Sequence, residues 1–182
     1  MRLRGVFQRL TGAFTRNHFE LLGLTPAYAL DSSKLESHYR ELQGRIHPDR
    51  FAAAPEAERR LAMQWATRAN EAYRTLKDPV ARARYLLSLK GFETDEETDT
   101  SMPADFLMRQ MEWREGVAEA RAARDAARLA GLAAGINEER AEMLRQLERA
   151  IDGDSNYGAG CSLVRKLRFL DKLDEEIDEA LQ

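Results

Sequence analysis

The sequence predicts an all-α protein that consists of an N-terminal helical hairpin and a C-terminal three-helix bundle. Only 5 prolines and 11 glycines interrupt long stretches of Ala, Leu, Arg and Glu, which are good helix formers. Apolar residues recur in these stretches at helical spacing, whereas Val and Ile, which favour strands, are scarce. With 43% hydrophobic and 32% charged residues, the 182-residue chain is typical of a globular protein with a real core.

The first two predicted helices lie before residue 47. An apolar segment at 19–24 indicates one or two helical turns that end near Pro26, because proline disfavours helix at the residue before it. Residues 31–33 offer N-caps for the next helix, and Ser33 with Glu36 is a candidate capping box. The apolar face of that helix consists of Leu35, Tyr39, Leu42 and Ile46.

The third and fourth predicted helices are each introduced by a proline. Pro48 ends the second helix, and Pro55 stands before an acidic run that suits the first turn of a third. Asp78 and Pro79 give a similar signal for a fourth helix, which closes before Gly91. The apolar face of the third helix consists of Leu61, Trp65, Ala69, Ala72 and Leu76.

A linker and a second helical unit follow. Residues 92–102 are acidic and threonine-rich without an apolar period, which indicates a linker. A first helix is expected over about 103–130, a second over about 137–151, and a third that ends near Leu181. Short connections between three helices predict an antiparallel bundle over 103–182.

Residues 1–16 form an N-terminal extension to the first unit, which we expect to span 17–91. The extension holds four arginines and no acid, with apolar residues opposite them at helical spacing. This pattern fits a mitochondrial presequence or a membrane-surface helix, but it often arises by chance in short basic segments, which favours a plain extension. At the other end, residues 171–182 are acidic and indicate a solvated helix face.

Few residues offer catalytic or metal-binding chemistry. Cys161 is the only cysteine, so the chain has no internal disulfide and no cysteine pair for a metal site, and a reducing compartment fits. His18, His38 and His47 lack metal-ligand spacing, and no nucleophile pattern accompanies His47. A net charge of −3 argues against a general nucleic-acid binder. We therefore expect no enzyme activity, no metal, no cofactor and no small-molecule substrate.

The most specific motif is the tripeptide His47-Pro48-Asp49, between the second and third helices. On physical grounds alone it is a turn in which proline fixes one φ angle, aspartate bonds nearby amides and histidine projects outward. Its context is more informative. A tyrosine-bearing amphipathic helix precedes it, and the stretch Asn-Glu-Ala-Tyr-Arg-Thr-Leu-Lys-Asp-Pro at 70–79 ends the helix that follows. This arrangement resembles the J-domain family.

The resemblance extends beyond the J-domain. The segment at 81–92, Ala-Arg-Ala-Arg-Tyr-Leu-Leu-Ser-Leu-Lys-Gly-Phe, is similar to the corresponding segment of the HscB family, the co-chaperones of iron–sulfur cluster assembly. The segments at 106–112 and 164–173 resemble the C-terminal bundle of that family. In all, the resemblance covers residues 17–181, whereas a generic J-protein would share only the first part.

The resemblance implies a mechanism in which this chain catalyses nothing itself. In the HscB family the J-domain docks on an ATP-bound DnaK-type chaperone, HscA, and the loop promotes ATP hydrolysis by that chaperone. The matching loop residues here are His47, Pro48 and Asp49. The basic side chains expected to meet an acidic chaperone surface are Arg40, Arg45 and Arg50. Exposed ion pairs are each worth about 0–1 kcal/mol, so these arginines should steer docking more than strengthen it.

The helix that begins at Pro103 carries two stripes of residues. The first is assigned to the bundle core and consists of Phe106, Gln110, Trp113, Val117 and Ala120. The second places apolar side chains beside a row of acids, and residue pattern alone would favour peripheral core. The resemblance favours instead a patch that binds the scaffold protein IscU. The matching residues are Leu107, Met108, Met111, Glu112, Glu115, Glu119 and Phe169.

These expectations describe an adaptor in iron–sulfur cluster biogenesis that holds an IscU-type scaffold and presents it to HscA. The chain lacks the N-terminal zinc-binding cysteines of some eukaryotic relatives, which points to a bacterial, cytoplasmic protein rather than one of the mitochondrial matrix. Two alternatives stay open: a J-domain co-chaperone with a different client, and a non-catalytic helical adaptor with an accidental tripeptide.

Overall fold

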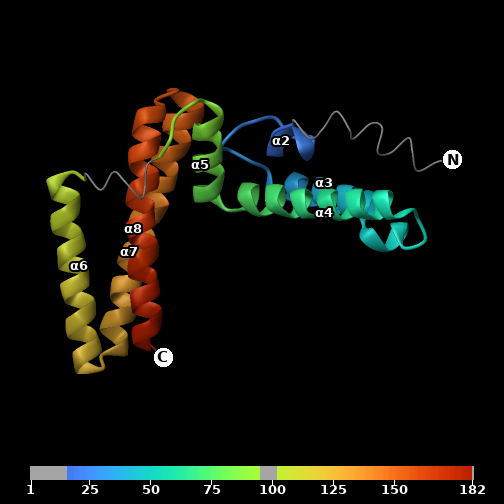
Figure 1. Cartoon of the computed structure of the whole chain (residues 1–182). Helices are drawn as coiled ribbons and strands as arrows, with labels where there is room; N and C mark the ends of the chain where they lie inside the picture. Colours follow the sequence, from blue (N-terminus) through green and yellow to red (C-terminus); the bar gives the residue numbers. More distant parts are fainter. Residues whose placement is uncertain (1–15, 95–101, 182) are drawn as a thin grey trace. The chain divides into compact units, whose positions relative to one another are not determined.

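The computed structural model describes residues 16–94 and 102–181 and contains no strand within those ranges, so the all-α prediction is confirmed. Contacts divide the chain into two compact units, 1–85 and 86–182 (Figure 1). The predicted domain limits stay a prediction. Most of the predicted N-terminal extension and of the predicted linker lies outside the described residues.

The first unit is built around a hairpin of two helices. Its elements are α2 (His18–Leu21), α3 (Ser32–Ile46), the 3-10 turn η2 (Pro48–Phe51), α4 (Glu56–Lys77) and the first part of α5 (Pro79–Leu89). The helix starts follow local capping chemistry. Asn17 and Glu20 form a capping box at α2, with hydrogen bonds of 2.9 and 3.1 Å. Asp78 accepts a hydrogen bond from the Ala81 amide at 2.6 Å and so caps α5.

The cap of α3 differs from the expected one. Asp31 accepts hydrogen bonds from the amides of Ser33 and Lys34, at 3.0 and 3.1 Å. The predicted capping box of Ser33 and Glu36 is therefore wrong, because Asp31 already fills the N-cap position and Ser33 lies inside the helix. The Glu36 carboxylate instead pairs with Arg40 one turn later.

The core of the first unit lies between α3 and α4 and beneath α2. Trp65, Phe19 and Phe51 are almost completely buried, and each such side chain stabilises the fold by roughly 1.5–3 kcal/mol. Small side chains on α4 allow α3 to approach closely. They are Ala62, Ala69 and Ala72, all fully buried. The predicted apolar face of α3 is confirmed for Leu35, Leu42 and Ile46, while Tyr39 is half-buried.

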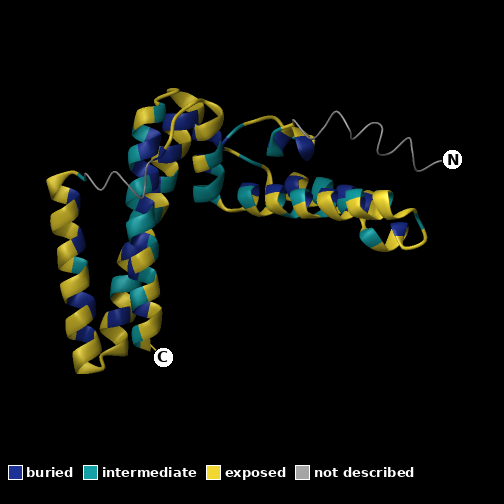
Figure 2. Ribbon diagram, viewed as in Figure 1, coloured by how far each residue is buried: buried dark blue, intermediate teal, exposed yellow. Residues whose placement is uncertain are grey.

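The second unit contains the expected bundle of three helices. They are α6 (Ala104–Ala123), α7 (Ala126–Glu148) and α8 (Tyr157–Leu181), and a single π-helical turn, η3 (Arg149–Gly153), extends α7. Buried positions on α6 lie on the side toward the other two helices, and the opposite side is exposed (Figure 2). The predicted core stripe is confirmed for Phe106, Gln110, Val117 and Ala120, whereas Trp113 is half-buried.

The break between the first two bundle helices does not lie at 131–136, where it was expected. It lies at Arg124, which has a left-handed backbone (φ 52°), followed by Asp125, whose carboxylate accepts a hydrogen bond from the Arg128 amide at 2.9 Å. Gly131 and Gly135 fall inside α7. Each glycine weakens the helix by about 1 kcal/mol, which the cap and the packing of the bundle outweigh.

Gly116 has a packing role that the sequence did not explain. It is buried on α6, and a Cβ atom at this position would lie 3.3 Å from a methyl group of Leu132 on α7. Glycine therefore allows α6 and α7 to come close together. This contact offsets the roughly 1 kcal/mol by which glycine weakens a helix.

Candidate partner-binding surfaces

The first candidate surface is the loop that connects α3 to α4. Ile46 and Phe51 are buried on either side of it and hold its ends to the hairpin core. Between them, the side chain of His47 is 51% exposed and that of Asp49 is 89% exposed. Among the described residues, His47 Nδ1 makes only long contacts, 3.4 Å to both the amide and the carboxylate of Asp49. The loop therefore exposes an imidazole and a carboxylate to solvent, while its two ends are fixed to the hairpin core.

The three candidate docking arginines lie beside this loop and are exposed, but none extends freely into solvent. Arg40 pairs with Glu36, and Arg45 lies 3.9 Å from Glu41, each across one turn of α3. The Arg50 guanidinium donates a hydrogen bond to the Gly44 carbonyl and so spans the loop. Such exposed i,i+4 pairs are worth about 0.3–0.5 kcal/mol, so a partner can displace them at little cost.

A polar cluster fixes the two helices that carry the loop. The hydroxyl of Tyr39 donates to the side chain of Asn70 at 2.8 Å, and Gln43 donates to that hydroxyl at 2.9 Å. The rings of Tyr39 and Tyr73 stack with centroids 4.1 Å apart. Asn70 and Tyr73 belong to the stretch at 70–79, so part of that motif serves to hold α3 against α4.

The segment after this stretch anchors α2 and α5 within the first unit. Arg82 donates to the Leu76 carbonyl at 2.7 Å and lies over the ring of Tyr28, 5.1 Å from its centroid. The hydroxyl of Tyr85 accepts a hydrogen bond from the His18 amide at 2.9 Å, and the two rings stack at 4.2 Å. These contacts join the start of the unit to its end.

His18 gives the first unit a pH-dependent stability. Burial lowers the pKa of His18, the carboxylate of Glu71 opposes that effect, and Arg68 adds to it. The unfolded chain therefore takes up a proton at higher pH than the folded one, so stability falls as pH decreases through the ordinary histidine value of about 6.5. Urea unfolding at pH 7.5 and 5.5 should show this loss, and His18→Gln should reduce it. Equal pH slopes in both proteins would contradict this account.

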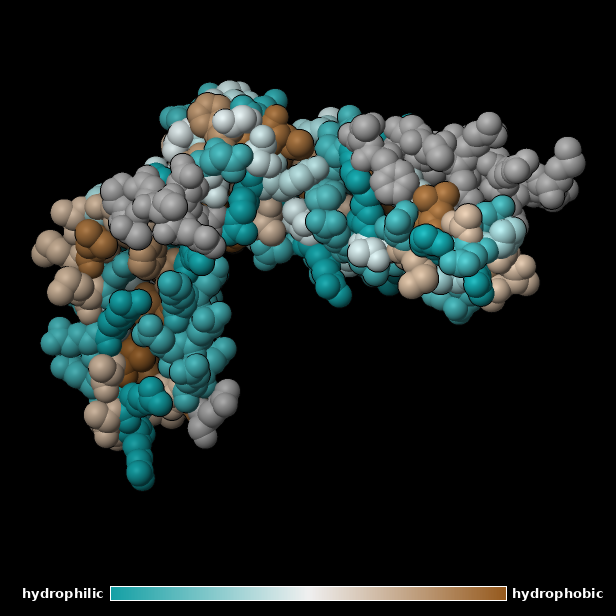
Figure 3. Space-filling view, viewed as in Figure 1, coloured by the Kyte–Doolittle hydropathy of each residue, from teal (hydrophilic) through white to brown (hydrophobic). Residues whose placement is uncertain are grey.

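The second candidate surface is the outward side of α6. Leu107, Met108 and Met111 are 41%, 64% and 71% exposed, so they belong to the surface and not to the bundle core. Figure 3 shows apolar side chains, in tan and brown, over this part of α6. Large apolar side chains grouped on a surface are typical of a binding site.

Phe169 on α8 is the remaining apolar residue of the predicted patch. Its ring is half-buried and packs edge-on against Phe106, with centroids 6.5 Å apart. Lys172 lies over the ring of Phe169 at 6.0 Å, and Lys166 lies over that of Phe106 at 5.3 Å. Phe169 is therefore a packing residue that stays partly accessible, and its place in the predicted patch stays a prediction.

The three acids of the predicted patch are exposed but differ in their partners. Glu119 forms an ion pair with Arg128, with 2.6 Å between the charged atoms. Glu112 and Glu115 have no ion pair or side-chain hydrogen bond within the described parts of the chain. These two carboxylates are thus the more available to a basic partner.

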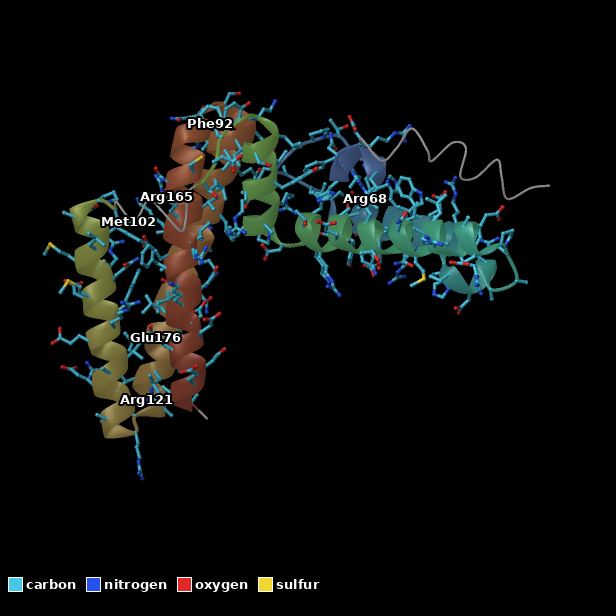
Figure 4. All side chains as sticks on the ribbon, in the orientation of Figure 1. Arg68, Phe92, Met102, Arg121, Arg165 and Glu176 are labelled. Carbon is cyan, nitrogen blue, oxygen red and sulfur yellow. The ribbon has the colours of Figure 1, made fainter. Side chains whose placement is uncertain are left out.

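Ion pairs between helices hold α6 and its neighbours in place. Arg109 on α6 pairs with Glu139 on α7 at 3.0 Å, and Arg114 pairs with Glu176 on α8 at 3.6 Å. Figure 4 shows Glu176 on the helix that faces α6. These pairs add modestly to the buried contacts that hold α6 against the bundle.

Arg140 is the centre of a partly buried charge cluster in the second unit. Its guanidinium bonds to both Asp171 and Asp174 of α8. Partial burial acts to lower the pKa of Arg140, but the hydrogen bonds and charges of the two aspartates outweigh it and raise the pKa. These two acids were expected on a solvated face; they are partly exposed, and α7 also brings Arg140 to them.

Arg140→Ala is expected to destabilise the bundle by about 1–2 kcal/mol, because it leaves two partly buried carboxylates without their partner. Arg145→Ala on the same helix is the matched control. Arg145 pairs with Glu142 only at the exposed surface, where the loss should stay below about 0.5 kcal/mol. Urea unfolding followed by circular dichroism measures both. Equal losses in the two variants would contradict the role of Arg140.

Three further observations concern the described residues. Within 16–94 and 102–181, no three or more His, Cys, Asp or Glu side chains are grouped so as to hold a metal ion. None of the helices described is both long enough and apolar enough to cross a membrane. Cys161 is a buried free cysteine on α8.

Two family models match the chain, one for each unit. A DnaJ domain model matches residues 17–85, which contain the exposed loop and the hairpin that supports it. A model described as the HSCB C-terminal oligomerisation domain matches residues 102–178. The loop and its domain define the class of protein: the chain is a J-domain co-chaperone.

Comparison with whole proteins identifies the family within this class. The chain is 46% identical over 167 residues to the co-chaperone protein HscB homolog of Aromatoleum aromaticum, covering 92% of this chain and 94% of that protein. It is 45% identical over 166 residues to the homolog of Burkholderia vietnamiensis, covering 91% and 94%. The chain belongs to the HscB family, the J-domain co-chaperones of iron–sulfur cluster assembly.

Solved structures of the family share this fold. Chaperone HscB from Vibrio cholerae aligns with a TM-score of 0.79 at 41% identity, covering 90% of this chain and 96% of that one. Human co-chaperone protein HscB aligns with a TM-score of 0.85 at 30% identity, covering 91% and 82%. A J-domain followed by a C-terminal helical domain is thus the architecture of these relatives as well.

Proposed function

We propose that this chain is an adaptor with two separate binding surfaces. The J-domain loop docks on HscA, a DnaK-type ATPase chaperone, and the outward stripe of α6 holds an IscU-type iron–sulfur scaffold. The chain itself carries no catalytic group in this proposal, since HscA hydrolyses the ATP. The setting is the bacterial cytoplasm, a proposal supported by the bacterial relatives.

The exposure of the loop supports docking on a chaperone. His47, Pro48 and Asp49 are the proposed activating residues, and the first and last contribute little to the fold because their side chains face solvent. Arg40, Arg45 and Arg50 are the proposed docking residues. Two of them form weak local ion pairs and the third bonds to a backbone carbonyl, so all three positive charges can turn toward an acidic surface, which mainly accelerates association.

The single observation that carries the scaffold assignment is the exposure of the α6 stripe. Leu107, Met108 and Met111 lie outside the core that Phe106, Gln110 and Val117 already fill, so packing does not explain them. The proposed scaffold-binding set is Leu107, Met108, Met111, Glu112, Glu115, Glu119 and Phe169. Apolar anchors beside carboxylates suit a partner whose apolar patch has a basic margin.

Isothermal titration calorimetry with an IscU-type scaffold tests this assignment. We expect one-to-one binding that weakens with salt, because Glu112 and Glu115 contribute electrostatic attraction. An unfolded model polypeptide serves as the alternative client. Binding of that polypeptide with no binding of the scaffold would favour a J-domain co-chaperone with a different client. Binding of neither would leave the α6 stripe without its proposed role.

A further inference from the structure

The methionines of the α6 stripe are unusually accessible to reagents in solution. Met108 and Met111 are 64% and 71% exposed, whereas Met143 in the bundle core is 5% exposed. They stand three residues apart on one helix, so both thioethers lie on the same face. Neither side chain has a hydrogen bond or ring contact among the described residues, so their sulfur atoms are open to attack.

We propose that Met108 and Met111 form a reversible oxidation site that releases the scaffold when peroxide accumulates. The inference rests on the proposed scaffold-binding function of α6. It adds a modification site and a chemical class of signal, a hydroperoxide, to that surface.

The chemistry is a two-electron transfer that balances without further reactants. A lone pair on Sδ attacks one oxygen of hydrogen peroxide, an S–O bond forms and the O–O bond breaks. The remaining oxygen leaves as water after proton transfer. The thioether is oxidised to a sulfoxide and the peroxide is reduced. Methionine sulfoxide reductases return the sulfoxide to the thioether with two electrons from thiols, and the oxygen leaves as water, which makes the modification regulatory and not only damaging.

The position of the two residues couples this chemistry to binding. Met108 and Met111 are two of the four apolar members of the proposed patch, the others being Leu107 and Phe169. A sulfoxide is polar, so it no longer gains from transfer out of water. We expect each oxidation to weaken scaffold binding on the order of tenfold, the ordinary effect of losing one apolar anchor.

Because Met108 and Met111 lie on the outward side of α6, their oxidation should not disturb the fold. The side of α6 that packs against the bundle carries Phe106, Val117 and Ala120, none of which is changed by peroxide under mild conditions. Both reactive sulfur atoms face away from that side. Oxidation should therefore alter the interface and leave the helical content of the protein unchanged.

The chain provides a matched internal control. Met63 on α4 is 61% exposed and lies in the first unit, outside the proposed scaffold surface. It should oxidise at a rate close to those of Met108 and Met111 without any effect on scaffold binding. Met143 should stay reduced in the folded protein.

The experiment treats the full chain with hydrogen peroxide, locates sulfoxides by peptide mass spectrometry, and measures affinity for an IscU-type scaffold by calorimetry. We expect oxidation at Met63, Met108 and Met111, a loss of affinity of at least about tenfold, and recovery after a methionine sulfoxide reductase. After peroxide treatment, the Met63→Leu variant should lose as much affinity for the scaffold as the unchanged protein does. The double variant Met108→Leu with Met111→Leu, compared with its own untreated sample, should lose none.

Several outcomes would overturn the proposal: slow oxidation at Met108 and Met111 relative to Met63, unchanged affinity after their oxidation, or equal peroxide sensitivity in the double leucine variant. Failure of the proposed scaffold binding itself would give a different result. If untreated protein does not bind the scaffold, the scaffold assignment and the release step both fail. Mass spectrometry then still decides whether Met108 and Met111 oxidise as readily as Met63.

Discussion

Replacement of His47 by glutamine is expected to lower the stimulation of HscA ATPase activity by at least about tenfold, the size of effect found for residues at the centre of an interface. The imidazole is half exposed and makes only long contacts of 3.4 Å within its own loop. Its removal should therefore change the stability of the fold by no more than about 0.5 kcal/mol. Any large loss of stimulation must then come from the contact with the chaperone.

Steady-state ATP hydrolysis by HscA measures this effect. Asp49→Asn keeps the shape of the side chain but removes its charge, and it should behave like His47→Gln because that carboxylate is 89% exposed. Arg74→Gln on the exposed surface of α4 is the control and should stimulate normally. Full stimulation by the His47 variant would refute the role of the loop.

A triple substitution of Leu107, Met108 and Met111 to serine is expected to weaken binding of an IscU-type scaffold by about 100-fold or more. A fully buried apolar side chain contributes about 1.5–3 kcal/mol, and even about 1 kcal/mol from each of three partly buried anchors gives this factor. All three side chains are exposed in the free protein, so the fold should survive the change. Phe169 is excluded from this test because it also packs against Phe106.

The matched control uses leucines of similar exposure in the same unit. Leu89 and Leu181 are 43% and 50% exposed and lie on α5 and α8. Their replacement by serine should leave scaffold affinity within about twofold, because they belong to no proposed interface. Calorimetry compares the two sets, and circular dichroism checks the fold. An equal loss in both would show that the effect is not specific to α6.

Much of the fold could be predicted from the sequence because its signals are local. Helical periodicity identified the faces of α3 and α4, and prolines marked the starts of α4 and α5. The off-core position of Met108 and Met111 also follows from spacing on one helix. Spacing alone did not decide whether this stripe is peripheral core or surface, since that depends on where α7 and α8 pack.

The features that the sequence did not predict depend on competition between alternative helix ends or on contacts between different helices. A break was expected between 130 and 137, but Arg124 ends α6 in the left-handed region, and arginine gives no sequence signal for that conformation. The pairs of Glu119 with Arg128 and of Arg140 with two aspartates join different helices. No pattern within a single helix predicts them.

Steady-state ATP hydrolysis by HscA, measured with this protein, an IscU-type scaffold, or both, tests the adaptor mechanism most directly. We expect stimulation that is synergistic, with both additions together exceeding the sum of their separate effects. The synergy should disappear with His47→Gln and, separately, with the triple serine variant of α6. Strong stimulation that is indifferent to the scaffold would contradict the adaptor mechanism, and so would synergy that survives either change.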